Sequence, residues 1–161
     1  MSTPRMARPD GLDHPIVPKV IKAMSRANVW LYRRTRGRIG GKWRVMSGFR
    51  KPVPVCLLTH TGRKSGKQFT TPLLYLRDGE DVVVVASQGG LPTHPQWYRN
   101  VVATPEVQVQ VRGDVRRMVT RTADAAERAM LWPRLVELYA DFETYQSWTD
   151  REIPVVVCSP A

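Results

Sequence analysis

The stretch "LLTHTGRKSGKQFTTPLLYL", residues 57–76, decides the fold, because it places a short polar turn between two apolar runs that favour strands. Such runs on either side of a glycine-containing turn predict a β-hairpin, here with strands over 53–59 and 69–76. The turn also gathers Arg63, Lys64 and Lys67. A hairpin needs no such charge, so the turn predicts an anion site made of backbone N–H groups, hydroxyls and cations.

Patterns further along the chain predict more strands and two helices. "VVVVA" (82–86) is typical of a strand covered on both faces. Alternating valines over 107–111 predict another strand, followed by a turn near Gly113 and Asp114 and a second strand up to residue 120. "IPVVVCSP" (153–160) predicts a closing strand. Helices are expected over 93–103 and after Asp124, with a capping box at Glu127 and a break at Pro133. Six or so short strands with a late helical segment predict an α+β fold, a small, partly open β-barrel.

The positive charge is confined to the beginning of the chain. The net charge is +11; residues 1–51 hold 13 Lys or Arg against 2 Asp, whereas residues 52–161 hold 12 of each sign. The sequence therefore divides into a disordered start, a basic helix and a connector over 1–51, and one globular domain over 52–161. An excess of charge at one end points to a polyanion, either a lipid surface or a nucleic acid.

The basic segment has the form of an amphipathic helix. From Pro18 onward, apolar residues recur at helical spacing, with basic residues opposite them and Trp30 on the flank. The apolar positions are Val17, Val20, Ile21, Met24, Ala27 and Leu31. This stripe would either meet an anionic membrane surface, through residues 15–51, or dock on the protein's own core, and the sequence leaves both open. No apolar run is long enough to span a bilayer or to form a signal peptide, so a cytoplasmic protein is expected.

Motifs for chemistry carried by side chains are weak. The turn is not a P-loop, because only three residues separate Gly62 from Gly66 and Gln68 follows Lys67. The histidines and cysteines show no metal-ligand spacing, so no metal is expected, and Cys56 and Cys158 are expected to be buried free thiols. A cofactor is therefore expected to carry the chemistry. A second anion site is predicted over 87–100, where a Gly-Gly loop leads into a helix N-terminus.

Five linked motifs carry a resemblance to a known family. They are "TGRKSG" (61–66), "TTPLLYLRDGEDVVVVASQGG" (70–90), "HPQWYRN" (94–100), "ATPEVQVQV" (103–111) and "ETYQSWTDREIPVVV" (143–157). In this order they resemble the deazaflavin-dependent nitroreductase family, which uses coenzyme F420. The resemblance covers roughly residues 50–161. It implies a split β-barrel related to FMN-binding oxidases, in which reduced F420 delivers a hydride to a quinone or a nitroaromatic acceptor.

The resemblance also implies site residues. Arg63, Lys64 and Ser65 would receive the phosphate and acidic tail of F420, and the deazaflavin ring and ribityl region would lie against Pro72, Leu73, Ser87, Gln88, Trp97 and Asn100. Tyr139, Phe142 and Tyr145 match three aromatics that face the acceptor, and Tyr139 or Tyr145 would orient it through its phenol. A core role for these three aromatics is an equal alternative. Phe69 and Phe142 depart from the family, which commonly carries Arg and Tyr there.

The predicted function is thus an F420H2-dependent reduction of an electron-poor acceptor such as a quinone, with nitroimidazoles as less favoured substrates. Two alternatives remain: an FMN-dependent reductase on the same fold, and a non-catalytic module that carries F420 or binds nucleic acid. The valine-rich, uncharged strands argue against nucleic acid as a partner, because RNA-binding barrels interleave aromatic and basic residues on their strands.

Overall fold

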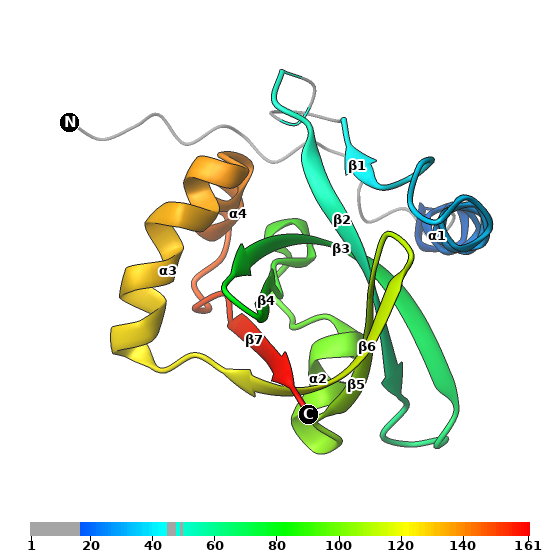
Figure 1. Cartoon of the computed structure of the whole chain (residues 1–161). Coiled ribbons are helices and arrows are strands. Elements are labelled where there is room, and N and C mark those ends of the chain that lie inside the picture. The colour runs from blue at the N-terminus through cyan, green and yellow to red at the C-terminus, as the bar shows by residue number, and fades with distance from the viewer. Residues whose placement is uncertain (1–16, 45–47, 49) are drawn as a thin grey trace.

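The computed structural model describes residues 17–44, 48 and 50–161, and its centre is a closed antiparallel barrel (Figure 1). Around the barrel the strands follow the order β2-β3-β4-β7-β6-β5, and β5 pairs back onto β2. The strands are β2 (Val53–Thr61), β3 (Gln68–Asp78), β4 (Asp81–Val85), β5 (Glu106–Val111), β6 (Asp114–Thr122) and β7 (Val155–Pro160). A seventh, two-residue strand, β1 (Lys42–Trp43), pairs with the start of β2 outside the barrel. The predicted α+β barrel of about six strands is confirmed, but the barrel is closed and not partly open, because β5 pairs with β2.

Side chains that point alternately into and out of the barrel form two hydrophobic cores. Val82 and Val84 of β4 face the barrel interior, whereas Val83 and Val85 face outward toward α3 (Ala125–Leu138) and α4 (Asp141–Ser147). β7 divides its side chains in the same way. The run of four valines is therefore buried on both faces, as the sequence predicts. Because both faces of these strands are covered, apolar side chains on either face add to the burial that stabilises the barrel.

The hairpin predicted from residues 57–76 is β2 and β3, with Thr61 opposite Gln68 across the turn. β3 is long and changes partner along its length: residues 68–74 pair with β2, and residues 75–78 pair with β4. Among the described strands, the 68–74 part has a partner on one side only, and Pro72 lies in this part. Proline is tolerated there because a strand edge without a partner does not need its missing N–H.

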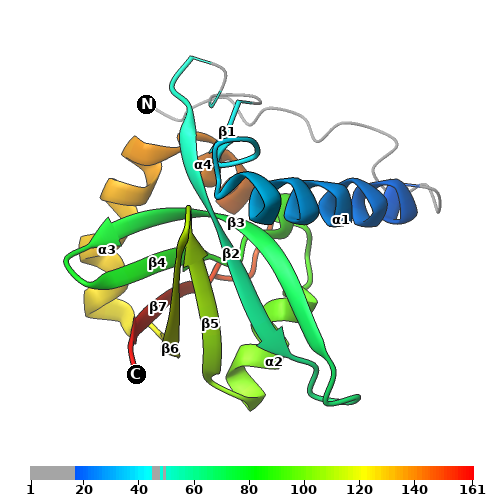
Figure 2. The same cartoon turned by 45° about the vertical axis from the view of Figure 1, so that its right-hand side comes forward.

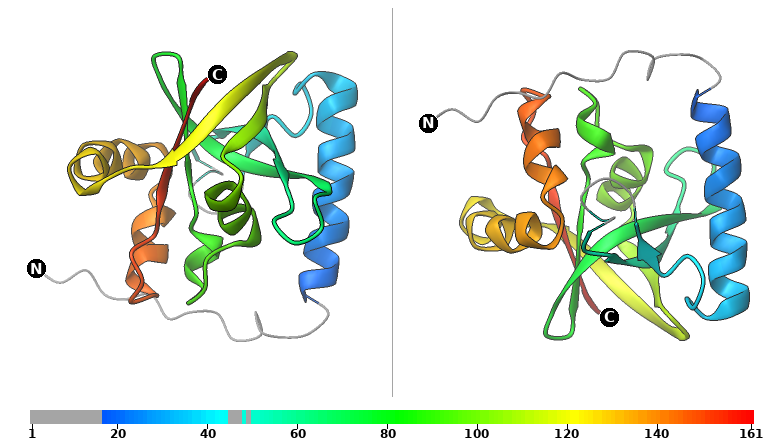
Figure 3. Two further views of the ribbon diagram at one scale, coloured as in Figure 1. Left: turned by 90° about the horizontal axis from the view of Figure 1, so that it is seen from below. Right: turned by 90° about the horizontal axis from the view of Figure 1, so that it is seen from above.

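The helices surround the barrel on three sides. α1 (Val17–Thr35) lies on the side opposite α3 and α4, as Figures 1 and 2 both show. α2 (Gln96–Ala103) covers one open end of the barrel, which is clearest from below in Figure 3. Trp97 and Val101 of α2 reach into the interior core. A short 3-10 helix, η2 (Gln88–Gly90), connects β4 to the loop before α2.

Two expectations about the helices are wrong in detail. Pro133 lies within the single helix α3 and does not split it; the chain instead breaks at Tyr139, where the backbone is extended. The helix expected over 93–103 begins only at Gln96, with Pro95 as its N-cap. The Asp124 cap is confirmed, because its carboxylate accepts the Glu127 N–H at 2.8 Å. The Glu127 side chain pairs with Arg121 and so leaves half of the capping box unmade.

The helix predicted at the N-terminus is present, and its described contacts with the barrel centre on Tyr32, which is not one of the apolar stripe residues. Tyr32 is fully buried and packs with Val29 against Val55 and Leu57 of β2. The stripe residues Val20 and Met24 are 48% and 67% exposed. The side chains of Val17 and Ile21, and the start expected to be disordered (1–13), lie outside the described residues. The division into a segment over 1–51 and a domain over 52–161 stays a prediction.

Candidate functional site

The basic turn contacts α2, so the anion site predicted in the turn and the one predicted over 87–100 lie next to each other. The Arg63 backbone N–H donates to Asn100 Oδ1 at 3.2 Å, and Arg63 Nη1 donates to the same oxygen at 3.0 Å. Arg63 Nη1 also donates to Gln96 Oε1 at 2.9 Å, at the first turn of the helix. The guanidinium is thereby held beside the N-terminus of α2, where the helix dipole already favours negative charge.

Lys64, Ser65 and Lys67 are exposed at the tip of the turn. The Ser65 hydroxyl accepts the Lys67 backbone N–H at 3.2 Å, which keeps the tip compact. Within the described part of the chain, none of the ion pairs involves Arg63, Lys64 or Lys67. These three cations thus lie close together without carboxylate partners, as expected of a site for a multiply charged anion.

Asn100 is buried and connects the turn to the barrel through His60. Because its Oδ1 accepts from Arg63, its Nδ2 faces His60 and must donate to His60 Nδ1, at 3.2 Å. The proton of the neutral imidazole is then on Nε2, which donates to Thr71 Oγ1 at 3.1 Å. Burial lowers the pKa of His60 to about 4. His60 was missed as a site residue because its role depends on a residue 40 positions away.

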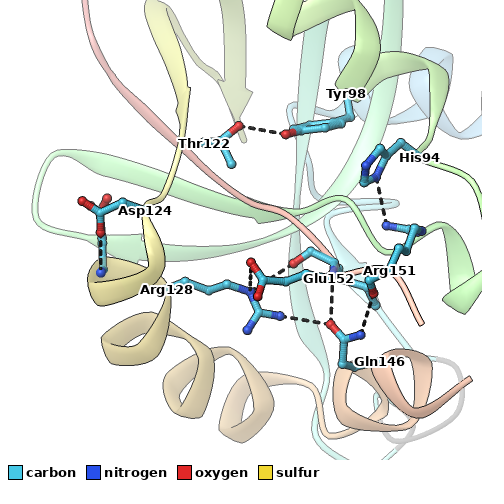
Figure 4. A network of polar contacts seen from close by, with 10 residues as sticks. His94, Tyr98, Thr122, Asp124, Arg128, Gln146, Arg151 and Glu152 are labelled. Atoms are coloured by element: carbon cyan, nitrogen blue, oxygen red, sulfur yellow. Dashed lines mark hydrogen bonds and ion pairs between the residues drawn. The ribbon is translucent and has the colours of Figure 1, made fainter. Parts of the chain in front are cut away.

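The loop before α2 is held by one arginine from the other end of the chain. Arg151 donates to the carbonyl oxygens of Ser87 at 2.8 Å, Leu91 at 2.9 Å and Ala86 at 3.2 Å, and contacts His94 Nδ1 at 3.1 Å. Figure 4 shows this arginine between His94 and Gln146, whose amide donates to the Arg151 carbonyl. Burial lowers the pKa of Arg151, and burial together with the nearby arginines lowers the pKa of His94.

The same loop packs directly on α4. Gln88, Gly89 and Gly90 all have positive φ, and a Cβ on Gly90 would lie 2.7 Å from the Tyr145 carbonyl oxygen. Only glycine fits this approach. The loop therefore brings the predicted cofactor residues Ser87 and Gln88 next to the predicted acceptor residue Tyr145.

The residues predicted to contact the deazaflavin ring, Pro72, Leu73 and Trp97, differ from one another in burial. Pro72 and Leu73 are half-buried on the part of β3 that has one partner strand, and Leu73 packs against the interior core. Trp97 is buried within that core, with its ring 6.2 Å from the ring of Tyr98. The structure therefore brings Asn100, Arg63 and the 87–90 loop to the same end of the barrel as α2, and it places Trp97 beneath them.

The three late aromatics lie together, but two of them are core residues. Tyr139 and Phe142 are buried against the outer barrel face, with ring centroids 5.0 Å apart, and Tyr145 is half-buried. The hydroxyls of Tyr139 and Tyr145 are 3.1 Å apart. Burial raises the pKa of both phenols, and their mutual hydrogen bond raises that of Tyr139 further while lowering that of Tyr145. Both therefore stay protonated near neutral pH and can act as hydrogen-bond donors.

The residues near the turn suit an anionic cofactor with a planar head. Arg63 lies beside the N-terminus of α2 without an ion-pair partner among the described residues, and Pro72 and Leu73 give β3 a half-buried apolar surface. No group of three His, Cys, Asp or Glu able to hold a metal occurs in the described residues. Cys56 and Cys158 are buried free thiols, as predicted.

Comparison with known proteins identifies relatives across most of the chain. A family model described as F420H(2)-dependent quinone reductase matches residues 24–160. A Mycobacterium tuberculosis protein whose name places it in that family is 51% identical over 117 residues, which cover 73% of this chain and 98% of the relative. Another protein of that organism, named F420H(2)-dependent quinone reductase, is 42% identical over 132 residues, covering 79% of this chain and 83% of the relative.

Solved structures agree with the sequence relatives. A structure titled F420-H2 dependent reductase is 41% identical and superposes with a TM-score of 0.62, covering 66% of this chain and 94% of that chain. A second, titled domain-swapped dimer, is also 41% identical, with a TM-score of 0.63 over 66% of this chain and 80% of that chain. Its title describes the assembly of that protein.

Proposed function

The chain belongs to the F420H(2)-dependent quinone reductase family and is an oxidoreductase that uses reduced F420; we propose that it holds the cofactor between the basic turn, α2 and the 87–90 loop. The observation that carries this proposal is the double contact of Arg63 with Asn100. Together with the contact to Gln96, it holds the cationic turn against α2 beside the helix N-terminus. The cofactor supplies a hydride from its reduced deazaflavin when it is bound.

The anionic end of the cofactor would be held by Arg63, Lys64 and Ser65. Arg63 offers a planar fork of donors that suits a phosphate or carboxylate, and Lys64 adds a point charge. Ser65 offers a hydroxyl at the exposed tip of the turn. The carboxylates of the acidic tail would extend from the turn toward solvent, where Lys67 is also exposed.

The ring end would lie against Pro72 and Leu73, with Ser87 and Gln88 at its edge. Arg151 fixes the carbonyl of Ser87 and so orients this edge. Asn100 would act mainly by positioning Arg63, because its amide already bonds Arg63 and His60. Trp97 would support the site from the core below, since only 6% of its surface is exposed.

The acceptor, a quinone, would lie beside Tyr145, the most exposed of the three late aromatics. Its phenol, hydrogen-bonded to Tyr139, can donate to an acceptor oxygen on which negative charge develops. Tyr139 would then position the phenol of Tyr145 from within the core. Because a hydroxyl can accept one hydrogen bond and donate another, Tyr145 can keep its contact with Tyr139 while it donates to the acceptor.

Titration of the purified protein with F420 tests the cofactor site. Changing Arg63 and Lys64 together to Ala is expected to weaken binding, because each charge-assisted contact contributes about 1.5–3 kcal/mol. The pair Arg77→Ala and Arg117→Ala removes the same charge from exposed positions away from the turn and should bind as the wild type does. Equal binding by the turn variant would reject the assignment. A parallel titration with FMN tests the alternative cofactor, and tighter binding of FMN than of F420 would favour it.

Quinones are proposed as better acceptors than nitroimidazoles because Tyr145 is the one phenol of the three late aromatics that is not buried, whereas Phe142 has no hydroxyl. A donor to a developing oxyanion contributes roughly 10²–10³ in rate, whereas stacking of a quinone needs no hydroxyl. Steady-state assays with menadione and a bicyclic nitroimidazole should give appreciable and weak turnover, respectively. Efficient nitroimidazole reduction by the wild type would contradict this selectivity.

We also place the protein at the cytoplasmic surface of the membrane, where lipid-soluble quinones lie. Met24 and Trp30 of α1 are 67% and 65% exposed, beside the basic residues Lys22 and Arg26. No helix among the described residues is long and apolar enough to cross a bilayer. The pair Met24→Ser and Trp30→Ser should release the protein from anionic vesicles, with F420 binding unchanged. Vesicle binding equal to that of the wild type would remove α1 from this role.

A further inference from the structure

A cavity of about 370 Å³ lies at the C-terminal end of α1, away from the cofactor site. Its walls come from the loop after α1, from β1 and from the tip of the β5–β6 hairpin, which approach one another in both Figure 1 and Figure 2. Five cationic side chains line it: Arg36, Arg38, Lys42, Arg44 and Arg112. In the described part of the chain no carboxylate lines this cavity, so it is a strongly positive hollow.

The cavity is built by fixed backbone contacts around Tyr32. The Tyr32 hydroxyl donates to the Val55 carbonyl at 2.9 Å and accepts the Arg112 N–H at 2.7 Å. The Tyr32 carbonyl accepts the Gly37 N–H at 2.8 Å. One buried phenol thus ties together α1, β2 and the hairpin tip. The chain approaches so closely that a Cβ on Gly37 would lie 2.9 Å from Arg112 Cα.

Two of the arginines stand on strained backbone. Arg36 and Arg112 have φ values of 50° and 55°, in the left-handed region that residues other than glycine rarely adopt. Gathering five cations also opposes folding through their mutual repulsion. Both the backbone strain and the charge repulsion therefore oppose folding, yet the folded chain keeps them. Residues with strained backbone dihedral angles cluster at ligand-binding sites. A bound anion would relieve the repulsion, and phosphate suits the planar donor forks of several arginines.

The surroundings of the cavity favour a lipid as the source of the phosphate. Ile39 lies on the cavity loop, Trp43 lies between the lining residues Lys42 and Arg44, and both are exposed. Trp30 is exposed on α1, one turn before the loop. Exposed Trp and Ile beside a cationic hollow match the border between headgroups and acyl chains, where indole rings are favoured.

This cavity is distinct from the cofactor site. Val55, bonded to Tyr32, and Arg63, in the basic turn, are eight residues apart along β2 and the start of its turn. At about 3.3 Å per strand residue they are separated by roughly 25 Å of chain.

We infer that the cavity binds the phosphate of an anionic phospholipid headgroup, and so orients the protein on the membrane surface. The inference rests on the proposed membrane contact of α1 and deepens it. Headgroup capture here and insertion of Met24 and Trp30 would hold one side of the molecule to the bilayer. The basic turn, at the far end of β2, would remain free for the soluble cofactor.

Co-sedimentation with vesicles containing phosphatidylglycerol tests the inference, using Arg36→Gln/Arg38→Gln. Each cation near an anionic surface contributes roughly fivefold in binding, so a loss of about 25-fold is expected. The matched control, Arg77→Gln/Arg117→Gln, has the same net charge and alters exposed positions outside the cavity. It should bind nearly as the wild type does. An equal loss in both variants would assign binding to net charge and overturn the site.

Further arms separate the source of the phosphate and the proposed function. Glycerol 3-phosphate is added to the vesicle assay at the concentration of lipid phosphate that gives half-maximal vesicle binding. If it displaces the protein from the vesicles, the occupant is a soluble phosphate ester and the lipid assignment fails. If a single-stranded oligonucleotide displaces the protein from the vesicles at an equal phosphate concentration, the lipid assignment also fails. Loss of vesicle binding by Met24→Ser/Trp30→Ser, but not by the cavity variant, would keep the membrane contact and reject the cavity. F420 binding should be unchanged in all these variants.

Discussion

Asn100 shows how much of the candidate site depends on a single side chain. Asn100→Ala removes two bonds to Arg63 and leaves the His60 Nδ1 acceptor buried without its partner. An unsatisfied buried group costs about 1–3 kcal/mol, so the free energy of unfolding should fall by about that much. F420 should also bind more weakly, because the turn is held less firmly. Denaturant unfolding and an F420 titration measure the two effects.

Gln96→Ala provides the control for that substitution. It removes only the exposed contact of the same guanidinium, so its effect on stability should stay within about 0.5 kcal/mol. If both alanine variants lose the same stability, the buried network around Asn100 has no special importance.

His60 makes stability depend on pH. Burial lowers its pKa from 6.5 to about 4, so in this interval the unfolded chain binds the proton more strongly than the folded protein does. The free energy of unfolding should therefore fall as pH decreases from about 6.5 to about 4, by up to about 3 kcal/mol. Above pH 6.5 this contribution is fully present.

Urea unfolding across this range, with His60→Gln beside the wild type, isolates the effect. The variant should show a shallower dependence on pH, while the contribution of His94 remains in both proteins. Parallel curves for the two proteins would show that His60 is protonated in the folded state as easily as in the unfolded chain.

At the scale of elements, Arg151 holds the loop that leads from β4 to α2. Arg151→Met removes donors to three carbonyls of residues 86–91 and the contact with His94. Amide hydrogen exchange in the 86–94 segment should then rise by at least about tenfold, since local opening no longer breaks these bonds. F420 should bind more weakly because the Ser87 edge of the site is no longer fixed.

Arg128→Met is the matched variant for this test. Arg128 belongs to the same polar network and bonds Gln146 and the Ile153 carbonyl, not the 86–94 loop (Figure 4). Exchange in the loop should therefore stay near the wild-type rate. Unchanged exchange in the Arg151 variant would mean that backbone packing of Gly90 on α4 is sufficient.

The elements also show where sequence patterns succeed. The hairpin at 57–76 and the two-sided strand at 82–86 were predicted because their signals are local: a turn between apolar runs, and uninterrupted valines. The docking face of α1 could not be predicted in this way. Tyr32 is buried because β2 and the β5–β6 tip offer hydrogen-bond partners, whereas the more apolar stripe with Met24 has no such partner in the described chain. Pro133 was expected to break a helix that tertiary packing keeps whole.

The site was predictable in part for the same reason. Arg63 and Asn100 were each predicted, from a basic turn and from a family motif, but their contact depends on how α2 closes the barrel. His60 and Arg151 carry no local signal, because His60 meets Asn100 and Arg151 meets the 86–94 loop only across 40 or more positions of sequence. The places of Tyr139 and Phe142 in the core follow from the position of α4, which the spacing of three did not reveal.

For the whole molecule, the two thiols report on barrel opening. Cys56 on β2 and Cys158 on β7 are fully buried in the same interior core, on opposite sides of the barrel. Burial raises the pKa of both thiols, that of Cys158 to about 12, so thiolate is scarce as well as inaccessible. A thiol reagent at pH 8 should label neither cysteine in native buffer. In denaturant it should label both cysteines, and at the same rate.

Single variants Cys56→Ala and Cys158→Ala allow the two rates to be measured separately. Equal rates would indicate that the closed barrel opens as one unit. Rapid labelling of one thiol under native conditions would show that part of the barrel opens by itself.

Pro72 affects how the molecule meets its own copies. The 68–74 part of β3 has one strand partner among the described residues, so its other edge resembles the open edge at which foreign strands add and proteins aggregate. Pro72 lies opposite Leu57 and has no N–H to donate to it, so the two residues form a non-hydrogen-bonded pair. The backbone groups of Pro72 therefore point away from β2, toward the unpaired edge. The outer row of donors is therefore interrupted at its middle. An incoming strand would find no continuous row of hydrogen-bond donors there, so this edge can stay unpaired beside the proposed cofactor site without promoting polymerisation.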